Sequence, residues 1–151
     1  MTAEQLFYLL PVVFPIFFIG LWLAVTTVLG RASGWKFLQG AYPDRIETPL
    51  VRLQLQSGSM GGRWGMPVNF NGCLRYDVCP TGLRVAIWRI FGWFQQPFFV
   101  PWGHITAEEK KMLFLTGIRL RFTGWPDGEL IIRRRTFERM VEAAPLALRS
   151  R

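Results

Sequence analysis

The chain has few of the residues from which catalytic and metal sites are usually built. Its 151 residues include one histidine, His104, and two cysteines, Cys73 and Cys79. A site of several imidazoles is therefore excluded, and a Ser-His-Asp arrangement would have to use His104. That histidine directly follows Pro101-Trp102-Gly103, where we expect a solvent-exposed loop. We predict no catalytic residue, no bound metal and no cofactor, so an enzyme is the least favoured class of function.

The two cysteines also exclude a disulfide-dense scaffold. Cys73 and Cys79 are six residues apart on one expected strand, which would separate them by ~20 Å if the strand is straight. That distance is far beyond the reach of a disulfide, and paired metal-binding cysteines usually lie closer in sequence. We interpret both as small buried hydrophobic residues.

Acidic residues are scarce as well. The chain has 10 Asp and Glu against 18 Lys and Arg, a formal net charge of +8. Half of the residues are hydrophobic and 19% are charged, which excludes a disordered chain. The length allows one small domain rather than two.

One long segment has no charge of either sign. Leu6 to Leu29 is a run of 24 residues without a charged side chain, and a helix of about 20 apolar residues covers the ~30 Å hydrocarbon core of a bilayer. Pro11 and Pro15 lie inside it, and membrane helices tolerate internal prolines. Gly20 with Ala24 could let two such helices approach closely, although small residues are common in membrane helices. We predict that residues 1–30 form a transmembrane helix.

A cleaved secretory signal is the main alternative for this segment. Such a signal has a basic start, a shorter apolar stretch and a small-residue cleavage site. Here the start carries Glu4, the run is longer, and no A-x-A pattern follows. All 18 basic side chains lie after the helix, so the positive-inside rule places the C-terminal part in the cytoplasm. The expected location is the cell inner (plasma) membrane, crossed once.

Residues 31–47 form the expected connector. A short helix over residues 35–42 would put Trp35, Leu38 and Tyr42 on one face, and Pro43 would end it. Residues 48–151 then form the expected domain.

In this domain the hydrophobic pattern changes to period two. We interpret the glycine-rich stretch 57–65 as a flexible hairpin loop, since it lacks the Gly-Lys-Ser/Thr ending of a phosphate loop. We expect a turn at Pro126-Asp127-Gly128 because proline and glycine suit its positions. Strands are expected over residues 50–55, 74–78, 83–87, 98–102, 118–123 and 130–135.

The last element returns to a helical period. Thr136 could cap a helix over residues 137–144, with Phe137, Met140, Val141 and Ala144 in one apolar stripe. The fold class predicted from these patterns is mainly β with one transmembrane helix. The β part would be a small antiparallel barrel or sandwich, capped by this C-terminal helix because open barrel ends and sheet edges need covering.

Residues 81–105 also resemble bacterial pleckstrin-homology-like domains. Thr81, Gly82 and Leu83 match the turn that opens a strand pair in that family. At the end of the segment, the residues that match the family are Val100, Pro101, Trp102 and Ile105. The connection around Gly92 to Gln96 is longer than the family pattern needs. The resemblance implies a bacterial protein of unknown function, a barrel with a C-terminal helix, and contact with protein or lipid rather than catalysis.

The proposed contact surface combines aromatic and basic residues. Trp93 and Phe94 lie in a segment too rich in rings for all of them to enter the core, which predicts an exposed apolar patch. Arg133, Arg134 and Arg135 form the densest basic run. They could attract an anionic lipid surface or be a solvated face, and no recognised motif favours nucleic acid. We predict a single-pass membrane protein whose cytoplasmic β domain contacts lipid or an unknown protein partner. The alternative is an accessory subunit of a larger membrane complex.

Overall fold

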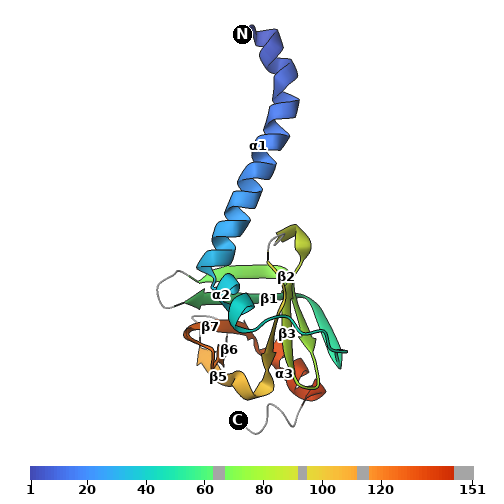
Figure 1. Cartoon of the computed structure of the whole chain (residues 1–151), viewed down its shortest axis with the longest axis vertical. Coiled ribbons are helices and arrows are strands. Elements are labelled where there is room, and N and C mark those ends of the chain that lie inside the picture. Colours follow the sequence, from blue (N-terminus) through green and yellow to red (C-terminus); the bar gives the residue numbers. More distant parts are fainter. Residues whose placement is uncertain (63–66, 92–94, 112–115, 145–151) are drawn as a thin grey trace.

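The computed structural model describes residues 1–62, 67–91, 95–111 and 116–144. A long helix stands on a small β domain that contains two further helices (Figure 1). The helices are α1 (Ala3–Ala32), α2 (Trp35–Ala41) and α3 (Arg134–Ala143), with single 3-10 turns η1 (Arg89–Phe91) and η2 (Trp102–His104). The strands are β1 (Val51–Gly62), β2 (Val68–Val78), β3 (Gly82–Ile87), β4 (Phe98–Pro101), β5 (Ile105–Lys111), β6 (Thr116–Phe122) and β7 (Trp125–Arg133).

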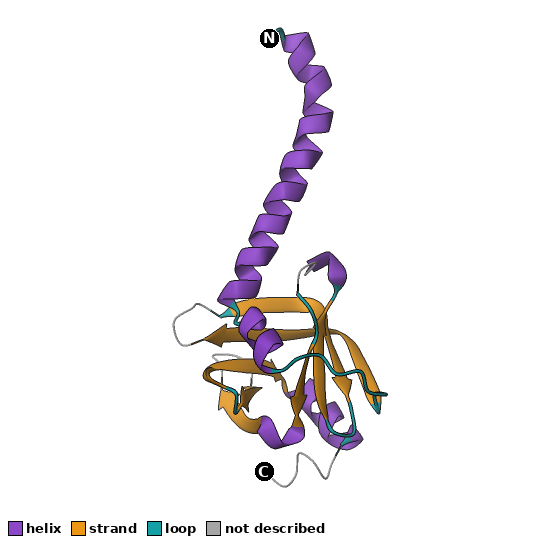
Figure 2. Cartoon of the chain, in the orientation of Figure 1, coloured by secondary structure: helices purple, strands orange, loops and turns teal. Residues whose placement is uncertain are grey.

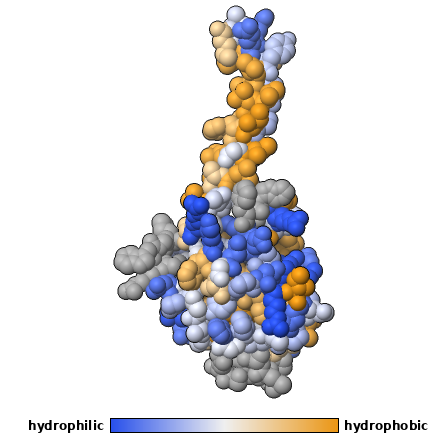
Figure 3. Space-filling view, in the orientation of Figure 1, coloured by the Kyte–Doolittle hydropathy of each residue, from blue (hydrophilic) through white to orange (hydrophobic). Residues whose placement is uncertain are grey.

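Helix α1 is the one described helix long and apolar enough to cross a membrane, by length and composition. Pro11 and Pro15 lie inside it. Its side chains are exposed nearly all round, and Figure 3 shows it as a mostly hydrophobic column above a domain of mixed surface. A water-soluble helix would place a polar face outward and an apolar face on a core. The predicted apolar segment is therefore a helix, and its surface is suited to lipid.

The β domain is one curled antiparallel sheet. Its seven described strands follow the order β4-β3-β2-β1-β7-β6-β5 (Figure 2). The two edge strands, β4 and β5, are neighbours in sequence and are joined by the single turn η2. The sheet therefore curls into a half-barrel around one core, with α3 as the C-terminal helix. This confirms the predicted fold class.

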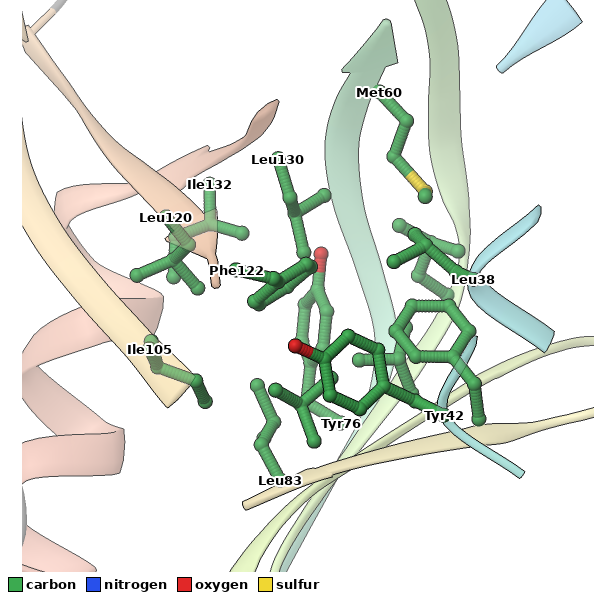
Figure 4. Close-up of a cluster of buried hydrophobic side chains, with 14 of the residues drawn as sticks. Leu38, Tyr42, Met60, Tyr76, Leu83, Ile105, Leu120, Phe122, Leu130 and Ile132 are labelled. Atoms are coloured by element: carbon green, nitrogen blue, oxygen red, sulfur yellow. The ribbon is translucent and has the colours of Figure 1, made fainter. Parts of the chain in front are cut away.

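The core is lined by strands from both halves of the sheet and by the connector (Figure 4). Trp35, Leu38 and Tyr42 are all buried, which confirms the predicted inner face of α2. Full burial of side chains of this size contributes about 2–3 kcal/mol each. Met140 and Ala144 of the predicted C-terminal stripe are buried as well.

The glycine-rich stretch is a correction to the sequence analysis. Residues 57–62 belong to β1 and are not a hairpin loop. Gly58, Ser59 and Met60 pair with both β2 and β7, and Gly61 and Gly62 pair with β7. Residues 63–65 of the predicted loop lie outside the described residues. Gly58 explains why small residues are needed here, because a Cβ atom would lie 2.6 Å from the Tyr76 hydroxyl. The strand crosses close over the core, where larger side chains would collide.

The turn before β7 and the start of α3 were also predicted wrongly. The turn is at Thr123-Gly124, and Pro126 to Gly128 lie within β7. Helix α3 begins at Arg134 with Arg133 as its N-cap. Thr136 is buried inside the helix and donates its hydroxyl hydrogen to Gln56 Oε1 at 2.9 Å. This long-range partner outweighed the local capping preference of threonine.

Candidate membrane-contact face

The segment that follows β3 runs beside the second half of α1. The Trp22 indole Nε1 donates a hydrogen bond to the Ile90 carbonyl oxygen at 3.0 Å. The Gln95 amide Nε2 donates to the Thr26 carbonyl oxygen at 3.1 Å. Both bonds join residues nearly 70 positions apart in the chain. They fix the orientation of this segment relative to α1.

A glycine in α1 makes this close approach possible. Gly30 is buried, and a Cβ atom there would lie 1.9 Å from Gln95 Nε2. Any larger residue would push the Gln95 side chain away from the helix. Small residues are typical of positions where another part of the chain must come close to a helix.

The connector α2 holds the same segment from the other side. The Trp35 indole donates to the Gln96 carbonyl oxygen at 2.8 Å, and the Gln96 backbone N–H donates to Gln39 Oε1 at 3.1 Å. Trp35 is fully buried, so this support is anchored in the core. The segment between β3 and β4 is thus tied to α1 and α2 alike.

Apolar and basic side chains are exposed at this end of the domain. Phe37 on α2, Trp88 before η1 and Ile90 within η1 are 56%, 53% and 59% exposed. Arg89 lies between the last two and is also exposed. We call these four residues the α1-proximal face. Exposed aromatic and aliphatic side chains next to basic ones are typical of surfaces that lie in the membrane interface.

The predicted contact surface is described only at its basic run. Trp93 and Phe94 lie outside the described residues. Arg133, Arg134 and Arg135 lie at the junction of β7 and α3, and Figure 1 shows α3 at the end of the domain away from α1.

The basic run is also partly neutralised. Arg134 pairs with Glu109 at 3.1 Å and with Glu138 at 3.3 Å. All three arginines are exposed, so these ion pairs contribute little to stability. A solvated face accounts for what is seen at this position.

The predicted membrane-spanning residues all lie in α1. Leu6 and Leu29 are 53% and 41% exposed. Gly20 has no atom within 4 Å of where its Cβ would be, so its surface is open.

His104 and the cysteines have structural surroundings. His104 is exposed, and its Nδ1 lies 3.0 Å from the Tyr42 hydroxyl, which accepts the Gly124 backbone N–H at 2.6 Å. Cys73 and Cys79 are free and buried, and burial raises the pKa of both thiols. Within the described residues, no group of three or more His, Cys, Asp or Glu side chains could hold a metal ion.

The contacts between α1 and the segment after β3 could not be found from the sequence. Trp22 lies in the middle of an apolar run, and no local pattern links it to Ile90. Nor do relatives supply that link: no protein-family model matches the chain, and no curated protein or solved structure matches it at a significant level.

Proposed function

We propose that this protein is a single-pass membrane protein whose cytoplasmic β domain is a contact module without catalytic activity. The observation that carries the proposal is the position of Trp88, Arg89 and Ile90, exposed on a turn that is hydrogen-bonded to α1. A membrane crossed by α1 would lie against these side chains. We infer that lipid is the first partner of the α1-proximal face.

The depth of η1 follows from the length of the helix. A hydrocarbon core that begins at Leu6 and takes about 20 residues ends near Val25. Trp22 then lies within about one turn of that boundary, so its partner Ile90 lies close to the boundary too. Thr26 and Thr27, which follow, bond to carbonyl oxygens of their own helix. Ile90 would thus reach the acyl boundary while Arg89 stays among the headgroups.

Charge supports the orientation of the proposal. Arg31 and Lys36 are exposed just after the apolar part of α1, and basic residues that follow a span favour the cytoplasmic side. The location we propose is therefore the cell inner (plasma) membrane. The resemblance to bacterial pleckstrin-homology-like domains points to the same class of function, and the curled sheet with its C-terminal helix is compatible with it.

A second candidate function is an accessory subunit of a larger membrane complex. One observation favours it, since the surface of α1 around Gly20 is open. A neighbouring helix could approach there at close range. In that case the β domain would still lie beside the bilayer, but α1 would be a protein-packing element as well as an anchor.

A topology experiment tests the proposal. The full chain carrying a C-terminal alkaline phosphatase should be inactive in intact cells, whereas a green fluorescent protein fusion should be fluorescent. The protein should remain in the membrane after alkaline carbonate extraction, with an intact mass that includes residues 1–30. A chain of lower mass released into the soluble fraction, or an active phosphatase fusion, would contradict it.

A further inference from the structure

A cavity of about 590 Å³ lies beside the first residue of η1, Arg89, which lines it. Its walls come from the middle of β1 and β2, the end of β3 and the start of η1. Trp88 and Arg89, which belong to the α1-proximal face, line one side. The Trp88 backbone N–H donates to the Cys73 carbonyl oxygen at 2.8 Å and holds the two sides together.

The cavity is formed where β1 is irregular. The pairing of β1 with β2 shifts register on both sides of Gln56. Leu55 has φ of +53°, a left-handed conformation that is uncommon for a side chain of this size. Irregularities of this kind bend a strand and redirect its side chains. As a result Leu55 is 69% exposed and lines the cavity instead of packing into the core.

We propose that this cavity binds the headgroup of an anionic phospholipid from the leaflet that α1 enters. The proposal rests on the proposed function, because it needs α1 in the membrane. The chemical basis is a pair of arginines, Arg75 and Arg89, beside apolar walls that include Leu55 and Trp88. Guanidinium groups bind phosphate through paired N–H donors, and the apolar walls suit the first carbons of the acyl chains.

The local charge favours an anion. Asp77 is the buried carboxylate nearest to Arg75, at 3.4 Å from its Nε. The same carboxylate also pairs with Arg52 at 3.1 Å and with Arg84 at 3.6 Å. One negative charge thus serves three guanidinium groups, although Arg84 has a second partner in Asp44 at 2.7 Å. Arg89, which also lines the cavity, adds a further positive charge.

The position favours a lipid over a soluble phosphate compound. Arg89 immediately precedes Ile90, whose carbonyl oxygen accepts the Trp22 bond. If Ile90 lies at the acyl boundary, the neighbouring Arg89 and the cavity that it lines lie near the level of the phosphate groups. A lipid there needs no transfer through water, and its chains remain in the bilayer.

The test measures lipid retained by the full chain after transfer from vesicles into mild detergent, by native mass spectrometry. The vesicles contain phosphatidylglycerol and phosphatidylcholine in equal amounts. We expect one phosphatidylglycerol per chain to be retained in preference to phosphatidylcholine. In the double variant R75Q/R89Q the preference for phosphatidylglycerol should be roughly thirtyfold lower. Each arginine near a membrane surface raises the affinity for an anionic lipid on the order of fivefold.

The control variant R121Q/R139Q removes the same charge from exposed positions on β6 and α3. It should change the preference by less than about twofold, the scale of a general charge effect. If R75Q disturbs the fold, as thermal unfolding would show, R89Q alone should still lower the preference about fivefold. Equal losses in both double variants, or no preference in the parent chain, would overturn the proposal.

Two further arms separate the possible sources of the phosphate. Free glycerol phosphate at millimolar concentration should not displace the lipid, and displacement would show a site for soluble phosphate compounds instead. Carbonate extraction of the same variants should leave all of them in the membrane. Release of the variants from the membrane by carbonate would contradict the proposed anchor itself. Variants that stay in the membrane and keep the lipid preference of the parent chain would contradict only the headgroup site.

Discussion

Trp22 in α1 and Ile90 in η1 are joined by a hydrogen bond of 3.0 Å across 68 residues of sequence. The bond attaches the segment after β3 to helix α1, although that segment belongs to the β domain. With the Gln95 bond to Thr26, it holds exposed apolar residues beside the helix.

Replacing Trp22 by phenylalanine removes the indole donor and keeps an aromatic ring. We expect local loosening of about 1 kcal/mol, the usual net value of one hydrogen bond. Amide hydrogen exchange across residues 88–91 and 95–97 should become faster by about fivefold in bicelles. The control is F14L, because Phe14 is on the same helix but far from η1, and it should leave those rates unchanged. Equal exchange rates in W22F and F14L would show that the bond does not hold η1.

Gly30 offers a test with a matched control in the same helix. Alanine at Gly30 places a Cβ 1.9 Å from Gln95 Nε2, whereas alanine at Gly20 meets no atom within 4 Å. We expect G30A to destabilise the contact by about 1–3 kcal/mol, the range for inserting a methyl group into a packed site. G20A should be neutral or slightly stabilising because alanine favours helix. Amide hydrogen exchange of residues 95 and 96 in bicelles would measure the difference, with Gln95 kept in place. Equal exchange rates in G30A and in the parent would contradict the packing described here.

Tyr76 predicts how stability depends on alkaline pH. It is fully buried, and this burial raises the pKa of its hydroxyl far above the usual range. In the unfolded chain a tyrosine loses its proton near pH 10. Above that pH the unfolded state binds fewer protons than the folded state, so stability falls by up to about 1.4 kcal/mol per pH unit.

The variant Y76F has no proton to lose at this position. Its free energy of unfolding should fall less steeply between pH 10 and 11.5 than that of the parent chain, as measured by denaturant titration in detergent. The buried thiols of Cys73 and Cys79, whose pKa values are also raised, contribute a slope of the same sign from lower pH in both proteins. Identical slopes above pH 10 would mean that Tyr76 becomes accessible to hydroxide before unfolding.

Asp77 supports three strands at once. Its buried carboxylate pairs with Arg52 on β1 and Arg84 on β3, which lie opposite it in the sheet. Asparagine at this position would leave the arginines without their shared counter-charge. We expect a loss of about 1–3 kcal/mol, less than for a fully buried ion pair because the arginines are partly exposed. Thermal unfolding would measure it, with glutamine at the exposed Glu142 as the control. A loss below 0.5 kcal/mol, of the order of ordinary surface substitutions, would show that the carboxylate is dispensable.

Local patterns predicted the elements whose partners are close in sequence. Residues 74–78 and 83–87 were predicted as strands from their period-two pattern, and they form parts of β2 and β3, which pair with each other. The inner face of α2 was predicted from its helical spacing.

Elements with distant partners were not found from the sequence. Strand β5 contains Glu108, Glu109, Lys110 and Lys111, and nothing in that sequence is typical of a strand. It is an edge strand, where charged residues prevent pairing with other chains, and Lys110 and Glu109 bond to Glu129 and Arg134. The candidate site had the same difficulty: Trp22 and Ile90 lie in different segments, and only the folded chain brings them within hydrogen-bonding distance.

The double attachment of the segment after β3 has a mechanical consequence. A helix joined to its domain by a single peptide linker could rotate while the domain stayed still. Here Trp22, Thr26 and Gly30 occupy one flank of α1 over two turns, and each touches the segment that continues into β4. Any rotation or axial movement of α1 would therefore be transmitted through this segment to the sheet, so that the helix and the domain would move as one body.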